Sequence, residues 1–119
     1  MAAAYGDSSE QEEMPSDTSR SIHAETATPE GVRVVLYEDT WRMHILDRHD
    51  EMEPYLDAVL DAVSAPEHRR PDLRLGQDKF YKQHAGPSRW LVTVVSFEQE
   101  PARIVTAFGR GLPPSEWTP

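Results

Sequence analysis

The sequence has no cysteine among its 119 residues and no long run of hydrophobic side chains. Without cysteine there are no disulfide bridges, thiolate metal sites or cysteine nucleophiles. A membrane-spanning helix needs about 20 consecutive apolar residues, and the chain contains no such stretch. The N-terminus lacks a basic stretch followed by an apolar core, so we expect no secretion signal. Together these absences predict a soluble, cytoplasmic protein.

Motifs that mark several enzyme classes are also missing. There is no glycine-rich phosphate loop, no dinucleotide-binding fingerprint, no serine nucleophile elbow and no His-Glu-x-x-His zinc motif. His44 and His49 are five residues apart, which is not the i, i+4 spacing that places two metal ligands on one face of a helix. We therefore expect neither a metal nor an organic cofactor.

Positive charge is scarce overall but unevenly distributed. The chain has 12 basic and 21 acidic residues, which gives a net charge of −9. Residues 1–30 hold seven acids against one base, Arg20, with few apolar side chains, so we expect a disordered acidic tail there. Residues 73–110 reverse the balance, with six basic and three acidic residues. Long-range attraction to nucleic acid should be weak, but this distribution allows a local basic cleft.

Two helices are expected in the first half of the folded part. Residues 41–49 follow Asp39 and Thr40, either of which suits a helix N-cap. Residues 53–64 repeat apolar side chains at three- and four-residue spacing, which indicates a helix with one face in a core. Pro66 ends this second helix.

The remaining folded segments have the composition of strands. Strands are expected at residues 32–37, 73–75, 80–82, 90–97 and 104–108. Turn residues between the later strands indicate hairpins and therefore an antiparallel sheet. We predict an α+β domain over residues 31–112, in which two helices pack on one face of a four-stranded antiparallel sheet with an extra N-terminal strand. A short coil over residues 113–119 would follow.

His44, Arg48 and His49 are the most unusual cluster in the sequence, because a hydrophobic core has little use for two imidazoles and a guanidinium. His44 and Arg48 share one face of the expected helix, whereas His49 points about 140° away from His44 unless the helix ends near it. Imidazole can transfer a proton near neutral pH, and guanidinium can donate two hydrogen bonds to a phosphate. Lys82, on an expected strand, would add a point charge to such a site.

Each of these residues also has a purely structural interpretation. His44 could be a half-buried side chain bonded to a strand, and Arg48 could pair with Glu51 on the surface. His49 could interact with the dipole at the C-terminus of the helix. Lys82 could be a solvated side chain on a half-exposed strand.

Four short motifs follow one another in a recognisable order. They are His-x-x-x-Arg-His at residues 44–49, Phe-Tyr-Lys at 80–82, Leu-Val-Thr-Val-Val at 91–95 and Val-Thr-Ala-Phe at 105–108. In this order and spacing they resemble the phage-associated nuclease-like domains of the Barnase, EndoU, colicin E5/D and RelE group. The resemblance covers about residues 31–110, essentially the whole folded part.

The resemblance implies a metal-independent endoribonuclease of toxin type, with two helices on a four-stranded sheet. It implies that RNA is cut by attack of a ribose 2′-hydroxyl on the adjacent phosphate. The site residues carried over are His44, Arg48, His49, Lys82 and Thr106, the last of which could instead be a simple strand residue. The alternative is a non-catalytic module that binds RNA or protein on the same scaffold. RNA is thus the expected partner, and an antitoxin or another protein is a second one.

Overall fold

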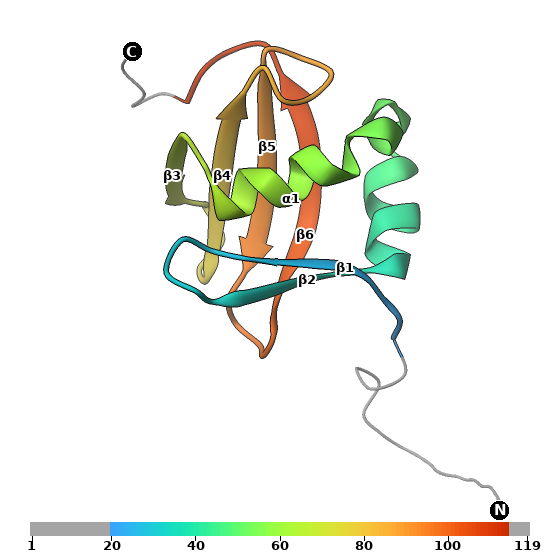
Figure 1. Cartoon of the computed structure of the whole chain (residues 1–119), viewed down its shortest axis with the longest axis vertical. Coiled ribbons are helices and arrows are strands. Elements are labelled where there is room, and N and C mark those ends of the chain that lie inside the picture. Colours follow the sequence, from blue (N-terminus) through green and yellow to red (C-terminus); the bar gives the residue numbers. More distant parts are fainter. Residues whose placement is uncertain (1–19, 115–119) are drawn as a thin grey trace, which may run out of the picture.

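Six strands form one mixed sheet across residues 20–114, the part of the chain that the computed structural model describes (Figure 1). Their order in the sheet is β1-β2-β6-β5-β4-β3. In chain order the strands are β1 (Ile22–Ala27), β2 (Arg33–Tyr37), β3 (His68–Pro71), β4 (Gln77–Gln83), β5 (Trp90–Ser96) and β6 (Ala102–Arg110).

One parallel pairing makes the sheet mixed. β2 runs parallel to β6 through Val34 opposite Ala102 and Val35 opposite Arg103, while every other neighbouring pair is antiparallel. The β1–β2 hairpin therefore joins only the first residues of β6, and in Figure 1 it crosses the end of the strands. β5 lies between β6 and β4. All seven of its residues are buried, as expected for a strand that is covered on both faces.

Three helical segments complete the domain: η2 (Thr40–Leu46), η3 (Asp50–Tyr55) and α1 (Leu56–Ser64). α1 crosses one face of the sheet (Figure 1). The Thr93 hydroxyl on β5 donates to the carbonyl oxygen of Val59 at 3.1 Å, and the Thr26 hydroxyl on β1 donates to that of Leu60 at 3.3 Å. These two bonds tie the helix to β5 inside the sheet and to β1 at its edge.

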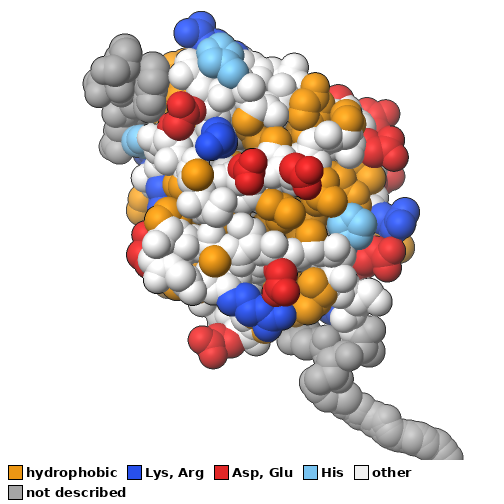
Figure 2. Space-filling view, viewed as in Figure 1, with side chains coloured by type: hydrophobic (Ala, Val, Ile, Leu, Met, Phe, Trp, Pro, Cys, Tyr) orange, Lys and Arg blue, Asp and Glu red, His pale blue; other side chains and the backbone are white. Residues whose placement is uncertain are grey.

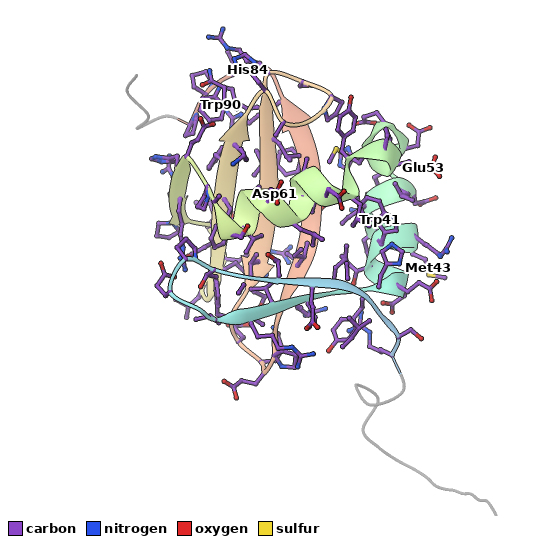
Figure 3. The ribbon with its side chains drawn as sticks, viewed as in Figure 1. Trp41, Met43, Glu53, Asp61, His84 and Trp90 are labelled. Atoms are coloured by element: carbon purple, nitrogen blue, oxygen red, sulfur yellow. The ribbon has the colours of Figure 1, made fainter. Side chains whose placement is uncertain are left out.

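The hydrophobic core lies between the sheet and α1. Trp41 and Ile45 of η2 and Met52 of η3 extend this core beyond α1. The buried core residues are Val34, Leu36, Trp41, Ile45, Met52, Val59, Ala62, Val63, Phe80, Leu91, Val95, Ala102, Ile104 and Ala107. A smaller cluster covers the opposite face of the sheet and consists of Tyr81, Trp90, Val92 and Val94, with Val105 and Phe108 packed against it. Trp41 and Trp90, which Figure 3 labels, are thus core residues.

Figure 2 shows acidic side chains on the α1 face. Acidic side chains there lie among hydrophobic ones, and the exposed Asp57 and Asp61 stand on the outer surface of α1. Figure 3 shows Asp61 in front of the sheet. An anionic ligand would be repelled from this face, so any site for such a ligand must lie elsewhere.

Arg69 on β3 links the β1–β2 turn to the other edge of the sheet. Its Nη1 donates to Glu30 at 2.6 Å, its Nε donates to Asp78 on β4 at 2.9 Å, and its guanidinium lies 4.5 Å from the centre of the Phe80 ring. The hydrogen bond from Arg69 holds the pKa of Glu30 below its usual range. Through these contacts Arg69 holds the β1–β2 turn next to β3 and β4.

The predicted α+β class is confirmed, but the predicted four-stranded antiparallel sheet is wrong. The sheet has six strands and one parallel pair. Residues 22–27, expected within a disordered tail, form β1, while residues 1–19 lie outside the described part. Residues 73–75, expected as a strand, belong to the β3–β4 turn, where Leu73 is 100% and Leu75 is 90% exposed. The two-residue spacing of Leu73 and Leu75 led to the wrong prediction of a strand, because no neighbouring strand covers the two leucines.

The two predicted helices also have different bounds and positions. The expected helix over residues 41–49 is shorter, and η2 has the wide π-type turn. The expected helix over residues 53–64 starts earlier as the tight 3₁₀ turn of η3 and becomes α-helical at Leu56. η2 packs beside the part of β6 that β2 leaves unpaired (Figure 1), and its buried residues Trp41 and Ile45 join the core that α1 covers. No helix within residues 20–114 is long and apolar enough to cross a bilayer.

Candidate functional site

A cavity of about 550 Å³ lies on the face of the sheet opposite α1. η2, the β3–β4 turn, β4, β5 and β6 all contribute to its wall. Its lining residues are Thr40, His44, Arg48, Asp72, Arg74, Gln77, Lys79, Val94, Arg103, Val105, Thr106 and Phe108. The floor is therefore apolar and the rim is polar and mainly cationic, which is typical of a ligand site.

One wall of the cavity is formed by three side chains at four-residue spacing, Thr40 and His44 of η2 and Arg48 just after its end. This spacing places them on one side of the segment, while Trp41 and Ile45 on the next side are buried in the core. His44 and Arg48 are exposed, so the half-buried interpretation of His44 does not apply. Arg48 makes no ion pair with any residue of the described part, which leaves its guanidinium available.

A β-bulge on β6 places Thr106 in the same cavity. Val94 pairs with Thr106 and Val95 pairs with Ile104, so Val105 is one extra residue on β6. Ile104 and Ala107 pack in the α1-side core, whereas Val105 and Thr106 both line the cavity. A bulge turns an additional side chain to one face of a sheet, and here it presents a hydroxyl next to the apolar floor.

Lys82 lies on the other face of the sheet and takes no part in this cavity. Its Nζ donates to the carbonyl oxygen of Ala65, just after α1, at 2.8 Å. Side chains alternate along a strand, so Lys82 shares its face with the core residue Phe80, while Lys79 shares the opposite face with Tyr81. Lys79 is the basic residue of β4 that lines the cavity. The expected convergence of Lys82 with His44 and Arg48 is thus corrected to a convergence with Lys79.

His49 lies beside the cavity rather than in its wall. Its ring centre is 5.9 Å from that of Phe108, which belongs to the floor. Its Nδ1 is 3.7 Å from a carboxylate oxygen of Glu51, a contact that is an ion pair only when the imidazole is protonated. The chain after η2 places the His49 ring next to Phe108.

The cavity has a clear excess of positive charge inside an acidic protein. Arg48, Arg74, Lys79 and Arg103 face one acid, Asp72, which contacts Lys79 at 3.5 Å. Arg74 and Arg103, like Arg48, form no ion pair with a described residue. Three guanidinium groups without a carboxylate partner therefore surround one concave surface, and such groups match the geometry of phosphate oxygens.

Three cationic residues of the site were missed in the sequence. Lys79 directly precedes the strand expected at residues 80–82 and was distinguishable from Lys82 only by strand register, which a single basic side chain does not specify. Arg74 belongs to the turn that was interpreted as a strand. Arg103 directly precedes the strand expected at residues 104–108, and its sequence neighbours do not reveal that β6 is flanked by β2 and β5 at this residue. The local excess of basic residues over 73–110 was the one signal that pointed to all three.

Comparison of the chain with family models, with curated proteins and with solved structures finds no match.

Proposed function

We propose that this protein is a toxin-type endoribonuclease, which cuts RNA by attack of a ribose 2′-hydroxyl of the RNA on the adjacent phosphate. The observation that supports the proposal best is the shared cavity of His44, Arg48, Lys79, Arg103 and Thr106. It brings an imidazole together with several cations and a hydroxyl. The same reaction is the one implied by the resemblance to the phage-associated nuclease-like domains.

The reaction needs proton transfer and stabilisation of charge at phosphorus. The 2′-oxygen forms a bond to phosphorus while the bond from phosphorus to the 5′-oxygen breaks. His44 accepts the proton of the 2′-hydroxyl and afterwards releases it to water, and the departing 5′-oxygen takes up a proton from water. Arg48, Arg103 and Lys79 offset the charge that grows on the non-bridging oxygens, and the Thr106 hydroxyl donates to one of them. The products are a 2′,3′-cyclic phosphate and a free 5′-hydroxyl.

The charge pattern of the whole surface restricts where RNA can bind. The acidic α1 face repels a polyanion, while the cavity on the opposite face attracts one. Lys79 is partly neutralised by Asp72, so the guanidinium groups of Arg48 and Arg103 would make the main phosphate contacts. RNA would thus lie across the sheet between η2 and the β3–β4 turn.

The first test is RNA cleavage by purified protein in buffer containing EDTA. We expect cleavage by the parent protein and a loss of about 10²- to 10⁴-fold in His44→Asn, the usual contribution of a proton-transfer residue. The matched control is His84→Asn. His84 lies in the β4–β5 loop, at the opposite end of the strands from the β1–β2 hairpin (Figure 3). Asn also tolerates the positive φ of 58° at residue 84.

Cleavage rates distinguish the outcomes directly. Equal rates in parent and His44→Asn protein, or intact RNA in both with the fold retained, would contradict the proposed activity. RNA that is bound but not cut, with His44→Asn binding as tightly as the parent, would identify the non-catalytic binding module instead, because a proton-transfer residue adds little to ground-state affinity.

A further inference from the structure

A second, smaller cavity of about 180 Å³ adjoins the proposed cleavage site, and it is lined by Arg20, Tyr37, Gln99 and Arg103. Arg103 lines both cavities. Arg20 links them as well, because its Nη2 donates at 3.2 Å to the hydroxyl of Thr40, a wall residue of the larger cavity. The two hollows are therefore neighbouring parts of one surface.

The smaller cavity is built from donors held in fixed positions. The Arg20 guanidinium lies 4.0 Å from the centre of the Tyr37 ring and donates to Asp39 at 2.7 Å. Its Nε is buried and has no hydrogen-bond partner within the described residues. Arg103 stands on β6 between β2 and β5, opposite Val35 on one side and Ser96 on the other. Two guanidinium groups, of Arg20 and Arg103, thus line one hollow.

Charge decides which ligand fits. Asp39 offsets the charge of Arg20, and the pairing with Arg20 keeps the pKa of Asp39 below its usual range. Arg103 has no such carboxylate partner in residues 20–114, so the hollow retains a net positive charge. Tyr37 is 6% exposed and its ring is covered by Arg20, so it offers little surface for stacking a base. An anionic group fits these donors better than a nucleobase does.

We propose that the Arg20–Arg103 cavity binds the phosphate next to the cleaved one, so that the substrate is a single RNA strand with at least two phosphates. This inference rests on the proposed ribonuclease function. Arg103 would contact both phosphates and set the path of the strand from η2 toward the β1–β2 hairpin. Single-strand binding of this kind is sequence-tolerant, because the contacts are made to the backbone.

The test uses three uncleavable 2′-O-methyl dinucleotides: one without a terminal phosphate, one with a 5′-phosphate and one with a 3′-phosphate. Each is titrated into the 13.5 kDa protein and followed by NMR shifts of the backbone amides. We expect one of the two phosphorylated forms to bind about tenfold more tightly than the unphosphorylated form, the gain typical of one charge-assisted hydrogen-bond contact. Amides near Tyr37 and Gln99 should shift with that form alone.

The informative quantity is the affinity for the tighter-binding phosphorylated dinucleotide divided by the affinity for the unphosphorylated one. This ratio reports on the smaller cavity, because a change at the larger cavity affects the binding of both ligands. We expect Arg103→Gln to bring this ratio close to one and Arg103→Lys to leave a smaller gain. Arg89→Gln removes the same charge next to the other end of β5 and should keep the full ratio. Folding of each variant is checked by its amide spectrum.

Each result has one interpretation. Equal affinity for all three dinucleotides, or a gain that persists in Arg103→Gln, would overturn the second phosphate site and leave the cleavage proposal standing. No binding of any dinucleotide, together with intact RNA in the cleavage assay, would overturn both proposals.

Discussion

Lys79 and Lys82 are three residues apart on β4 and point to opposite faces of the sheet. Lys79 faces the basic cavity and contacts Asp72. Lys82 faces α1 and donates to the carbonyl oxygen of Ala65, where a cation also interacts favourably with the negative end of the helix. The same residue type therefore has a binding role on one face and a structural role on the other.

Substitution of each lysine by methionine separates these roles, because methionine keeps the apolar stem and removes the charge. Lys79→Met should lower the rate of RNA cleavage about 10- to 100-fold through loss of charge stabilisation, with little change in stability. Lys82→Met should cleave at the parent rate and lose about 1 kcal/mol in the free energy of unfolding. Initial cleavage rates and urea unfolding curves measure both. The reverse assignment of effects would place the site on the α1 face.

The element that shapes the site most is β6. Its bulge at Val105 turns Thr106 toward the cavity, and its position between β2 and β5 fixes Arg103. Sequence reasoning identified β6 as a strand and selected Thr106 through the family resemblance. It could not locate the bulge, because one extra residue leaves no mark in a short run of strand-forming side chains.

Two threonines on neighbouring strands provide an element-scale prediction. Thr93 on β5 is buried and bonds to Val59 of α1, whereas the Thr106 hydroxyl makes no hydrogen bond with a described residue. Thr93→Val should reduce the free energy of unfolding by about 1 kcal/mol and leave cleavage unchanged. Thr106→Val should keep stability within about 0.5 kcal/mol and slow cleavage at least about tenfold. Chemical denaturation and cleavage assays on the same preparations compare them. A Thr106→Val protein as active as the parent would remove the hydroxyl from the mechanism.

At the scale of the whole molecule, the sheet separates stability from the proposed chemistry. The face toward α1 holds the larger hydrophobic core, and its outer surface is acidic. The opposite face holds the smaller cluster and the basic cavity. This separation explains how a chain with a net charge of −9 can present a concave cationic surface.

The sequence predicted the local elements better than their assembly. β2, β5 and β6 were expected from their apolar and β-branched residues, and turn residues correctly indicated the β5–β6 hairpin. The parallel pairing of β2 with β6 joins residues far apart in the chain, and no local pattern specifies such a contact. β1 has few strand-forming residues and is held by its pairing with β2, by the bond of Thr26 to α1 and by the turn contact of Glu30 with Arg69.

The chemical identity of the RNA ends after cleavage tests the central claim most directly. The substrate is a DNA strand with a single ribonucleotide, incubated with the protein in EDTA and compared with the all-DNA strand and with a 2′-O-methyl replacement. We predict a cut only after the unmodified ribonucleotide, with a 2′,3′-cyclic phosphate and a 5′-hydroxyl identified by mass spectrometry. Cleavage of the 2′-O-methyl strand, or products that carry a 5′-phosphate, would contradict attack by the ribose 2′-hydroxyl in this cavity.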